Sequence, residues 1–418
     1  MKIIADLHIH SKYSRACSGQ LVLPEIDKYC EMKGVDIVAT GDFTHPEWFK
    51  SLKEELVEKE SGLYGLKANK DSKVRFLCST EISCIYSKGG KVRRLHICIL
   101  APNLKVVEKI NLALDKIGNI KSDGRPILGL DAKELARIVL GIDEKCMIIP
   151  AHIWTPWFAM FGSKSGFDSI EECYEELSNK IYAIETGLSS DPQMNWRVKN
   201  LDRVSIVSSS DAHSLPNIAR EANVFEIDKL SYDEICRIIK DKNPKEFLET
   251  IEFYPEEGMY HFDGHRDCKI SFSPSETKKQ KNICPVCKKL LTIGVMNRVD
   301  ELADAKRSED YIDSNRVPFK KLIELDKIIA EALGIKSRNS KQVQEEYLNL
   351  IKNFGTEFEI LLNVDYESLK EKTLPQIAEG IKRVREGKVH IQPGFDGQYG
   401  VIKIFDENER LNYQKKLF

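Results

Sequence analysis

The sequence predicts an α/β protein with its active site at the ends of the strands, and two observations support this. Short apolar runs alternate with segments of helical spacing over the first 240 residues. Side chains of metal-binding type lie at the ends of these runs: His8, His10, Asp42, Glu81, His96, His152, Asp211 and His213. In parallel β/α folds, side chains just beyond the strands converge on one mouth of the sheet. We therefore expect a mostly parallel sheet that carries a metal centre.

The apolar runs give the order of the elements. Strands are expected at residues 3–5, 35–39, 74–77, 97–100, 147–149, 181–184 and 204–207. Helical spacing predicts helices at 131–140, 169–177 and 235–240, the last opened by a capping-box pattern at Ser231 and Glu234. Further along, amphipathic spacing predicts helices at 299–306, 319–333, 340–354 and 377–385, with strand-like runs at 389–391 and 401–405.

Composition divides the chain into three predicted parts. Residues 1–240 form the catalytic α/β domain, and residues 241–295 are short of helical signal and rich in Gly, Pro, His and Cys. Residues 296–418 form a mainly helical C-terminal domain. A chain of 418 residues is long enough for two or three domains with a sizeable core.

Bulk properties exclude some classes of partner. The net charge of −2 creates no global field toward nucleic acid or membrane, so any nucleic-acid surface must be local. No apolar stretch approaches the ~20 residues that cross a bilayer, and the first residues lack the apolar region of a signal peptide. We therefore expect a cytoplasmic protein without a membrane partner. Its eleven cysteines are then expected to be thiols or metal ligands, not disulfides.

The eight ligand-type residues are too many for one ion. We expect two or three divalent ions that share a bridging carboxylate, either Glu81 or Asp211. Mixed imidazole and carboxylate ligands favour Zn, with Mn or Mg as alternatives. Such ions activate water and stabilise charge on a phosphoryl group, which predicts hydrolysis of a phosphate ester by these same eight residues. His45 is an alternative to Asp42, and Glu185 is expected either to orient a ligand or to be a buried carboxylate with another partner.

A second metal site is predicted from spacing alone. His265 and Cys268 are separated by two residues, as are Cys284 and Cys287, and fifteen residues lie between the two pairs. This spacing is typical of a closed, structural zinc site. A redox pair at Cys284 and Cys287 is the alternative, and His261 is a possible substitute for His265.

Local patterns favour a polynucleotide substrate. A predicted hairpin tip carries Arg93 and Arg94 just before His96, and an aromatic loop with Trp154 and Trp157 follows His152. Each pattern alone is equally compatible with a solvated loop or with loop packing. The basic patches lie at residues 88–94, 278–289 and 383–388. Three basic patches and an aromatic loop around one phosphoesterase site favour a nucleic acid over a small ester.

The ordered ligand set resembles the PHP (polymerase and histidinol phosphatase) domain. This resemblance implies a distorted, seven-stranded β/α barrel that holds three metal ions. The PHP pattern has nine ligands, and eight positions match here, although Asp42 stands where many members have His. The ninth ligand is missing in the region of residues 13–17, which implies that one ion is weakly held or absent.

A longer set of motifs resembles the endonuclease Q family. The motifs are Pro150-Ala-His-Ile-Trp-Thr-Pro-Trp157, Phe161-Gly-Ser-Lys-Ser-Gly-Phe-Asp168, Glu185-Thr-Gly-Leu-Ser-Ser-Asp-Pro192, Met194-Asn-Trp-Arg197, Ser209-Ser-Asp-Ala-His-Ser214 and the zinc pattern. The resemblance runs along nearly the whole chain. It implies a metal-dependent DNA repair endonuclease that nicks on the 5′ side of deaminated bases (uracil, hypoxanthine, xanthine) and abasic sites.

This resemblance also implies how DNA is held. Such an enzyme should extrude the damaged nucleotide, so Trp154 and Trp157 become candidates for a wedge or pocket wall. Lys164, Asn195 and Arg197 lie in the shared motifs and are candidates for DNA contact. The last residues, 414–418, begin like a sliding-clamp-binding peptide, which some family members carry.

Two other functions remain open at this point. A small-molecule phosphatase of the histidinol-phosphatase type would not need the zinc segment, the helical tail or the aromatic loop. A non-catalytic DNA-binding scaffold with a degenerate PHP site is allowed by the missing ninth ligand, but the eight retained ligands argue against it.

Overall fold

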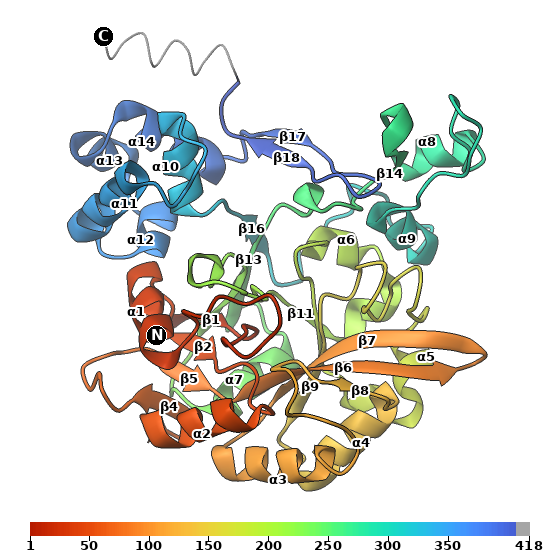
Figure 1. Ribbon diagram of the computed structural model, residues 1–418. Coiled ribbons are helices and arrows are strands. Elements are labelled where there is room, and N and C mark those ends of the chain that lie inside the picture. Colours follow the sequence, from red (N-terminus) through yellow and green to blue (C-terminus); the bar gives the residue numbers. More distant parts are fainter. Residues whose placement is uncertain (407–418) are drawn as a thin grey trace.

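The structure is a computed structural model that describes residues 1–406 (Figure 1). Its strands are β1 (Lys2–Asp6), β2 (Ile37–Ala39), β3 (Leu56–Glu60), β4 (Leu63–Leu66), β5 (Arg75–Leu77), β6 (Ser79–Lys88), β7 (Lys91–Leu100), β8 (Ile127–Leu128), β9 (Met147–Pro150), β10 (Ala183–Glu185), β11 (Ser205–Val207), β12 (Ala222–Glu226), β13 (Phe247–Glu252), β14 (Asp263–His265), β15 (Ile270–Phe272), β16 (Phe319–Lys321), β17 (His390–Gln392) and β18 (Val401–Lys403).

The helices are α1 (Leu23–Lys33), α2 (Pro46–Glu55), α3 (Leu104–Leu114), α4 (Ala132–Ile142), α5 (Ile170–Tyr174), α6 (Pro192–Trp196), α7 (Tyr232–Asp241), α8 (Pro274–Lys279), α9 (Val295–Leu302), α10 (Leu325–Leu333), α11 (Lys341–Phe354), α12 (Glu357–Leu362), α13 (Tyr366–Lys372) and α14 (Pro375–Arg385). None of these described helices has both the length and the apolar character needed to cross a bilayer.

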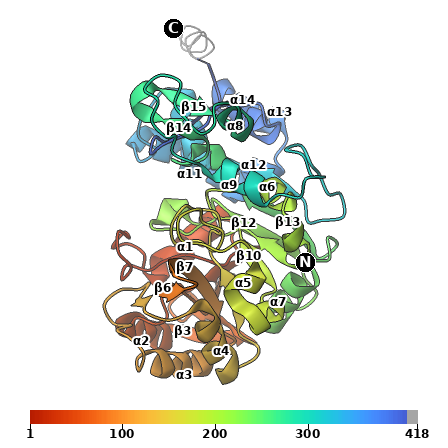
Figure 2. The same ribbon diagram turned by 90° about the vertical axis from the view of Figure 1, so that its right-hand side faces the viewer.

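The prediction of an α/β protein with a helical C-terminal part is confirmed. Each of the predicted runs of the first part forms a strand: β1, β2, β5, β7, β9, β10 and β11. Figures 1 and 2 show these strands in the lower part of the molecule, with α2, α3 and α4 beneath them. The segments of α8, β14 and β15 and the helices α10 to α14 lie above.

A single closed barrel is not found among the described strands. They pair in separate sheets, with the orders β16-β13-β12-β1-β2-β5-β4-β3, β8-β6-β7-β9 and β10-β11. The direction is also mixed: β1, β2 and β5 run parallel, whereas β7 is antiparallel to both β6 and β9. The reason is local, because β6 and β7 are joined by a two-residue turn, and so short a turn can only join antiparallel strands.

The end of the first strand and the end of β11 are tied together by Asp6. This buried carboxylate accepts hydrogen bonds from Ser210 N (3.0 Å), Ser210 Oγ (2.6 Å) and Ala219 N (2.8 Å). Burial nevertheless raises its pKa to about 6. Just beyond, Asp211 N donates to His8 O (2.9 Å) and His10 N donates to Ala212 O (3.1 Å). Two segments two hundred residues apart in sequence are thereby brought into register.

Two C-terminal predictions are wrong in detail. Residues 319–321 form β16, which pairs in parallel with β13, and the helix α10 begins only at Leu325. Helix α9 lies at Val295–Leu302, four residues before the predicted 299–306. Because β13 and β16 extend the sheet of β1, that sheet takes strands from beyond residue 240. The division at residues 240 and 295 stays a prediction.

A buried carboxylate pair lies where β12 begins and β13 ends, with Glu221 just before β12 and Glu252 as the last residue of β13. Glu221 and Glu252 are fully buried, and one oxygen of each lacks a hydrogen-bond partner. Burial raises the pKa of Glu252 to about 8, although Thr250 Oγ1 donates to it at 2.5 Å. Burial and the charge of Glu252 also raise the pKa of Glu221. Folding therefore takes up a proton at neutral pH, which couples the stability of this sheet to pH.

We expect Glu252→Gln to stabilise the protein at alkaline pH. The folded carboxyl keeps its proton up to about pH 8, whereas the unfolded one loses it near its ordinary pKa, so wild-type stability falls as the pH rises across this window. The variant should match the wild type near pH 5 and gain about 1–3 kcal/mol at pH 8, measured by urea unfolding. Glu31→Gln, at an exposed position of α1, is the control. A gain that does not grow with pH would contradict this account.

Candidate metal-dependent active site

Glu81 lies between two groups of potential metal ligands. Its Oε2 is 3.2 Å from His10 Nε2 and 3.6 Å from His8 Nε2, and Asp211 Oδ1 is 2.9 Å from His10 Nε2. Its Oε1 is 2.8 Å from His96 Nδ1 and 3.1 Å from His152 Nε2. The two oxygens of one carboxylate therefore face different groups, as a bridging ligand requires. Of the two bridges that the sequence left open, the geometry favours Glu81.

The chemistry of these groups fits metal ions. His8 Nε2, His10 Nε2 and Asp211 Oδ1 are buried and form no hydrogen bond with the described residues, although both nitrogens lie within 4 Å of Asp211 Oδ1. Ligand atoms 2.0–2.2 Å from a tetrahedral Zn²⁺ are about 3.4 Å apart, close to the separations found here. Unpaired polar atoms are costly in a protein interior, and a shared cation would satisfy them all.

The backbone turns sharply where ligands follow strands. Asp42, His152 and Asp211 have positive φ angles of 49°, 30° and 46°, a conformation that is uncommon outside glycine. Strain of this kind clusters at functional sites. Gly187 makes room for His152, since a Cβ at this glycine would lie 2.3 Å from the Cβ of the histidine.

Two carboxylates orient the first histidines. Glu185 accepts a hydrogen bond from His8 Nδ1 at 3.1 Å and another from His152 N at 3.0 Å. Asp42 Oδ1 lies 2.9 Å from His10 Nδ1, and its Oδ2 accepts from Ser11 N and Ser11 Oγ. Carboxylates in this position fix the tautomer of a metal-binding histidine. In the structure both oxygens of Asp42 are engaged by His10 and Ser11, and its role as a metal ligand stays a prediction.

His213 and His45 also lie outside the two groups. His213 Nδ1 donates to Asp211 O at 2.8 Å, and its ring packs edge-on against His10. His45 stacks on Tyr13 with 4.3 Å between ring centroids. Within residues 1–406, no group of three ligand atoms includes Asp42, His45 or His213.

Electrostatics keep the bridging carboxylate ionised. Burial alone would raise the pKa of Glu81, but His96, Arg125 and His8 hold it well below its ordinary value. In the same way, burial would raise the pKa of Asp211, and the close contact with the His10 imidazole and the charge of His8 lower it instead. Both carboxylates are therefore anionic at neutral pH, the form in which they bind cations.

Sequence analysis missed two residues of this centre. Cys98 forms a group with His8 and Glu185, but burial raises its pKa to about 12, so it is a neutral thiol. Cys98 lies two residues after His96 on the same strand, and side chains two residues apart on a strand point to the same face. This spacing is the sequence signal that could have placed Cys98 near the ligands. Arg125 lies in the loop between α3 and α4, and its Nη1 donates to Glu81 Oε2 at 3.1 Å. No periodic pattern marks a loop arginine.

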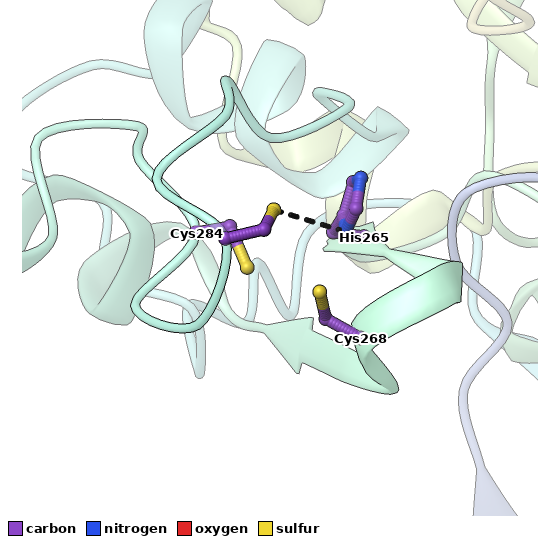
Figure 3. A group of neighbouring side chains, drawn as sticks. His265, Cys268 and Cys284 are labelled. Carbon is purple, nitrogen blue, oxygen red and sulfur yellow. Dashed lines mark hydrogen bonds between the residues drawn. The ribbon is translucent and has the colours of Figure 1, made fainter.

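The predicted zinc ligands also lie together. His265, Cys268, Cys284 and Cys287 each offer an atom within 4.8 Å of the others, and Figure 3 shows His265, Cys268 and Cys284 around a common centre. Cys287 Sγ lies 3.7 Å from His265 Nδ1. His261 is buried elsewhere and is not part of this group. A four-ligand set without an open position suits structural zinc.

A similar protein with a solved structure identifies the family. The crystal structure of the lesion-specific endonuclease PfuEndoQ from Pyrococcus furiosus is 30% identical, with a TM-score of 0.84 over 97% of this chain and 96% of that one. The chain belongs to the endonuclease Q family. A second solved structure, endonuclease Q in complex with a 27-mer duplex with an abasic lesion at the active site, is also 30% identical, with a TM-score of 0.83 over 98% of both chains.

Sequence comparisons agree with membership of the endonuclease Q family. The uncharacterized protein MJ0043 of Methanocaldococcus jannaschii is 34% identical over 256 residues, which are 60% of this chain and 31% of that protein. The chain therefore spans about a third of the length of MJ0043. The uncharacterized protein YqxK of Bacillus subtilis is 27% identical over 423 residues, 96% of this chain and 99% of that protein. The family MJ0043 C-terminal domain matches residues 324–388.

Four of the DNA-contact candidates are accessible. Trp157 is 40% exposed, and Lys164 is also exposed. Arg93 and Arg94 are half-buried on β7, where Arg93 lies 4.0 Å from the centre of the Phe167 ring and donates to Gly166 O. These residues stand on the β6–β7 hairpin and on the loops that follow His152, so they remain candidates.

The other three candidates are buried. Trp154 Nε1 donates to Asn195 Oδ1 at 2.8 Å, and Asn195 in turn donates to Asp191 O. Arg197 pairs with Asp300 of α9 at 2.6 Å. Burial and internal hydrogen bonds engage Trp154 and Asn195, whereas Nε and Nη1 of Arg197 are buried without a partner, and DNA contact by these residues stays a prediction. They fix the loop that carries Trp157 and hold α9 against α6.

We expect Cys287→Ser to remove the predicted structural zinc without removing the catalytic ions. A serine hydroxyl is a poor zinc ligand, so the protein should lose one zinc per chain by elemental analysis and unfold at lower temperature. Cys30→Ser, at a buried cysteine distant from both metal groups, controls for loss of a thiol. Unchanged zinc content in Cys287→Ser would contradict the assignment.

Proposed function

We propose that this chain is a metal-dependent DNA repair endonuclease that hydrolyses the phosphodiester on the 5′ side of deaminated bases and abasic sites. Membership of the endonuclease Q family supports an endonuclease, and one relative was solved with an abasic duplex at its active site. The proposal also names the deaminated bases at which the enzyme cuts, which are uracil, hypoxanthine and xanthine.

The observation that carries the proposal is the position of Glu81 between two ligand groups. The candidate ligands of a pair of ions are His8, His10 and Asp211 on one side and His96 and His152 on the other. Divalent ions in such a pair activate water and stabilise the charge of a phosphoryl group. Asp42 and Glu185 hold His10 and His8 in the orientation that the ions need.

A cavity beside this centre has the size and lining for an extruded nucleobase. It encloses about 600 Å³, within the range of small-ligand pockets. Its apolar and aromatic walls include Trp157, Leu188, Phe253 and Tyr260, and polar groups such as Asn217 and Arg220 also line it. Aromatic walls stack on bases, and polar groups read their edges.

The cavity is built from the same loops as the metal centre. Its segment 155–157 follows His152, and Leu188 and Ser189 follow Glu185. Arg220 Nε donates to Ser210 O at 3.0 Å, next to Asp211. A base bound in this cavity would therefore lie beside a phosphate at the ions. This supports cleavage close to the lesion.

The direct test is a nicking assay on labelled duplexes that carry one deoxyuridine, one deoxyinosine or one abasic site, with Mg, Mn or Zn added. We expect one nick on the 5′ side of each lesion and a loss of at least ~10³-fold in Glu81→Gln, which keeps the shape of the side chain and removes the charge. Asp228→Asn, an exposed carboxylate, should cleave like the wild type. Intact duplexes with every metal would overturn the proposal.

A second test separates the base cavity from the metal centre. Met259 lines the cavity, so Met259→Trp should fill it and exclude a base. We expect this variant to lose cleavage at deoxyuridine and deoxyinosine by ~10²-fold or more but to retain cleavage at an abasic site, which has no base to accommodate. Leu112→Trp, on the exposed side of α3, is the control. An equal loss on all three substrates would argue against a base cavity at this place.

A further inference from the structure

The guanidinium of Arg125 places a positive charge at the metal centre. Arg125 Nη1 lies 3.1 Å from Glu81 Oε2, the oxygen that faces His10 and Asp211. The side chain of Glu81 is fully buried, whereas that of Arg125 is 24% exposed. The guanidinium therefore stands at the boundary between the ligand groups and the solvent, where a substrate has to arrive.

The loop that carries Arg125 is pinned on both sides. Gly124 N donates to Tyr13 O at 3.0 Å, and a Cβ at this glycine would lie 2.4 Å from Asp42 Oδ2, so only glycine allows this close approach. Arg125 N donates to Asp123 Oδ1 at 2.9 Å. Pro126 O accepts from Ser83 N at 3.0 Å, which joins the loop to β6. The position of the guanidinium is therefore preorganised.

Metal binding alone does not account for an arginine here. A guanidinium beside the bridging carboxylate repels divalent ions and competes for one of their ligand atoms, so it weakens their binding. Among the described residues, Glu81 is the one hydrogen-bond acceptor of this guanidinium, so most of its five N–H groups have no partner in the protein. A phosphate matches such a planar set of donors.

Charge balance points to the same place. Asp42 lies at His10 Nδ1, and a Cβ on Gly124, the residue before Arg125, would lie 2.4 Å from Asp42 Oδ2. Glu81 acts electrostatically on Arg125, as do Asp211 and Asp123. The arginine thus supplies positive charge where several carboxylates gather.

We propose that Arg125 is a catalytic residue whose guanidinium binds a non-bridging oxygen of the scissile phosphate and stabilises the charge that builds there. This inference rests on the proposed phosphodiester hydrolysis. The arginine forms no covalent bond and transfers no proton. It acts as a fixed cation beside the ligand groups.

The test compares Arg125→Ala and Arg125→Lys with the wild type in single-turnover cleavage of the abasic duplex. Removing one charged contact to a developing oxyanion costs about 10²–10³-fold in rate, and lysine should restore part of it. The Kd for the duplex, measured in Ca²⁺ without cleavage, should change less than ~5-fold. Lys121→Ala, which removes an exposed charge from the same loop, should behave as the wild type.

Two further measurements distinguish a catalytic role of Arg125 from a structural one. Catalytic-centre metal content, by elemental analysis, should be unchanged or higher in Arg125→Ala. A phosphorothioate that replaces the contacted non-bridging oxygen should slow the wild type but not slow Arg125→Ala further, because the contact is already absent. Three results would each overturn the inference. They are loss of metal from Arg125→Ala, a wild-type rate in this variant, and additive effects of the arginine substitution and the phosphorothioate.

The same variants are measured on bis(p-nitrophenyl) phosphate, so that the inference and the proposed function fail separately. If the wild type hydrolyses this ester but leaves the lesion duplexes uncut, the proposed DNA activity is overturned. The ratio of the wild-type rate to the Arg125→Ala rate on the ester would then still test the role of Arg125. Nicking by the wild type with no effect of Arg125→Ala on either substrate would overturn the inference alone. A wild type that hydrolyses neither substrate would overturn both.

Discussion

The carboxylate of Glu81 is the constraint on which the rest of the catalytic part depends. Its two oxygens face ligands from the residues that follow β1, β9 and β11 and from His96 in the middle of β7, so these four segments must lie within a few ångströms of one another. Isolated, this buried anion would be strongly unfavourable, and the surrounding histidines and Arg125 keep it ionised. The hydrogen bonds of Asp6, Asp42 and Glu185 stabilise this arrangement, because each carboxylate holds a ligand-bearing segment in place.

Sequence predicts the elements of this centre well and its connections less well. The positions of His8, His10, His152 and Asp211 just beyond strands follow from apolar runs, whereas His96 lies within β7, and all five reach Glu81. Asp42 stays a predicted ligand, but its contacts are those of an orienting carboxylate, and the two look alike in sequence. Only the three-dimensional contact with His10 and Ser11 separates the two roles.

The remaining differences have similar physical causes. The run at 319–333 has helical spacing, yet its first residues complete a sheet edge, since tertiary pairing overrides local propensity. Trp154, Asn195 and Arg197 are predicted DNA contacts by type, and their burial and internal contacts could not be seen in the sequence. Arg125 and the pair of Glu221 with Glu252 carry no sequence signal, because each depends on a neighbour distant in the chain. The possible clamp-binding residues 414–418 lie outside the described residues, and the sliding clamp stays a prediction.

The most direct test of the central claim is a crystal structure of the metal-loaded protein with anomalous scattering recorded at the absorption edges of Zn and Mn. The account predicts two ions about 3.5–4 Å apart, one on each side of the Glu81 carboxylate, with His8, His10 and Asp211 at one ion and His96 and His152 at the other. A single ion, or ions that do not contact Glu81, would contradict it.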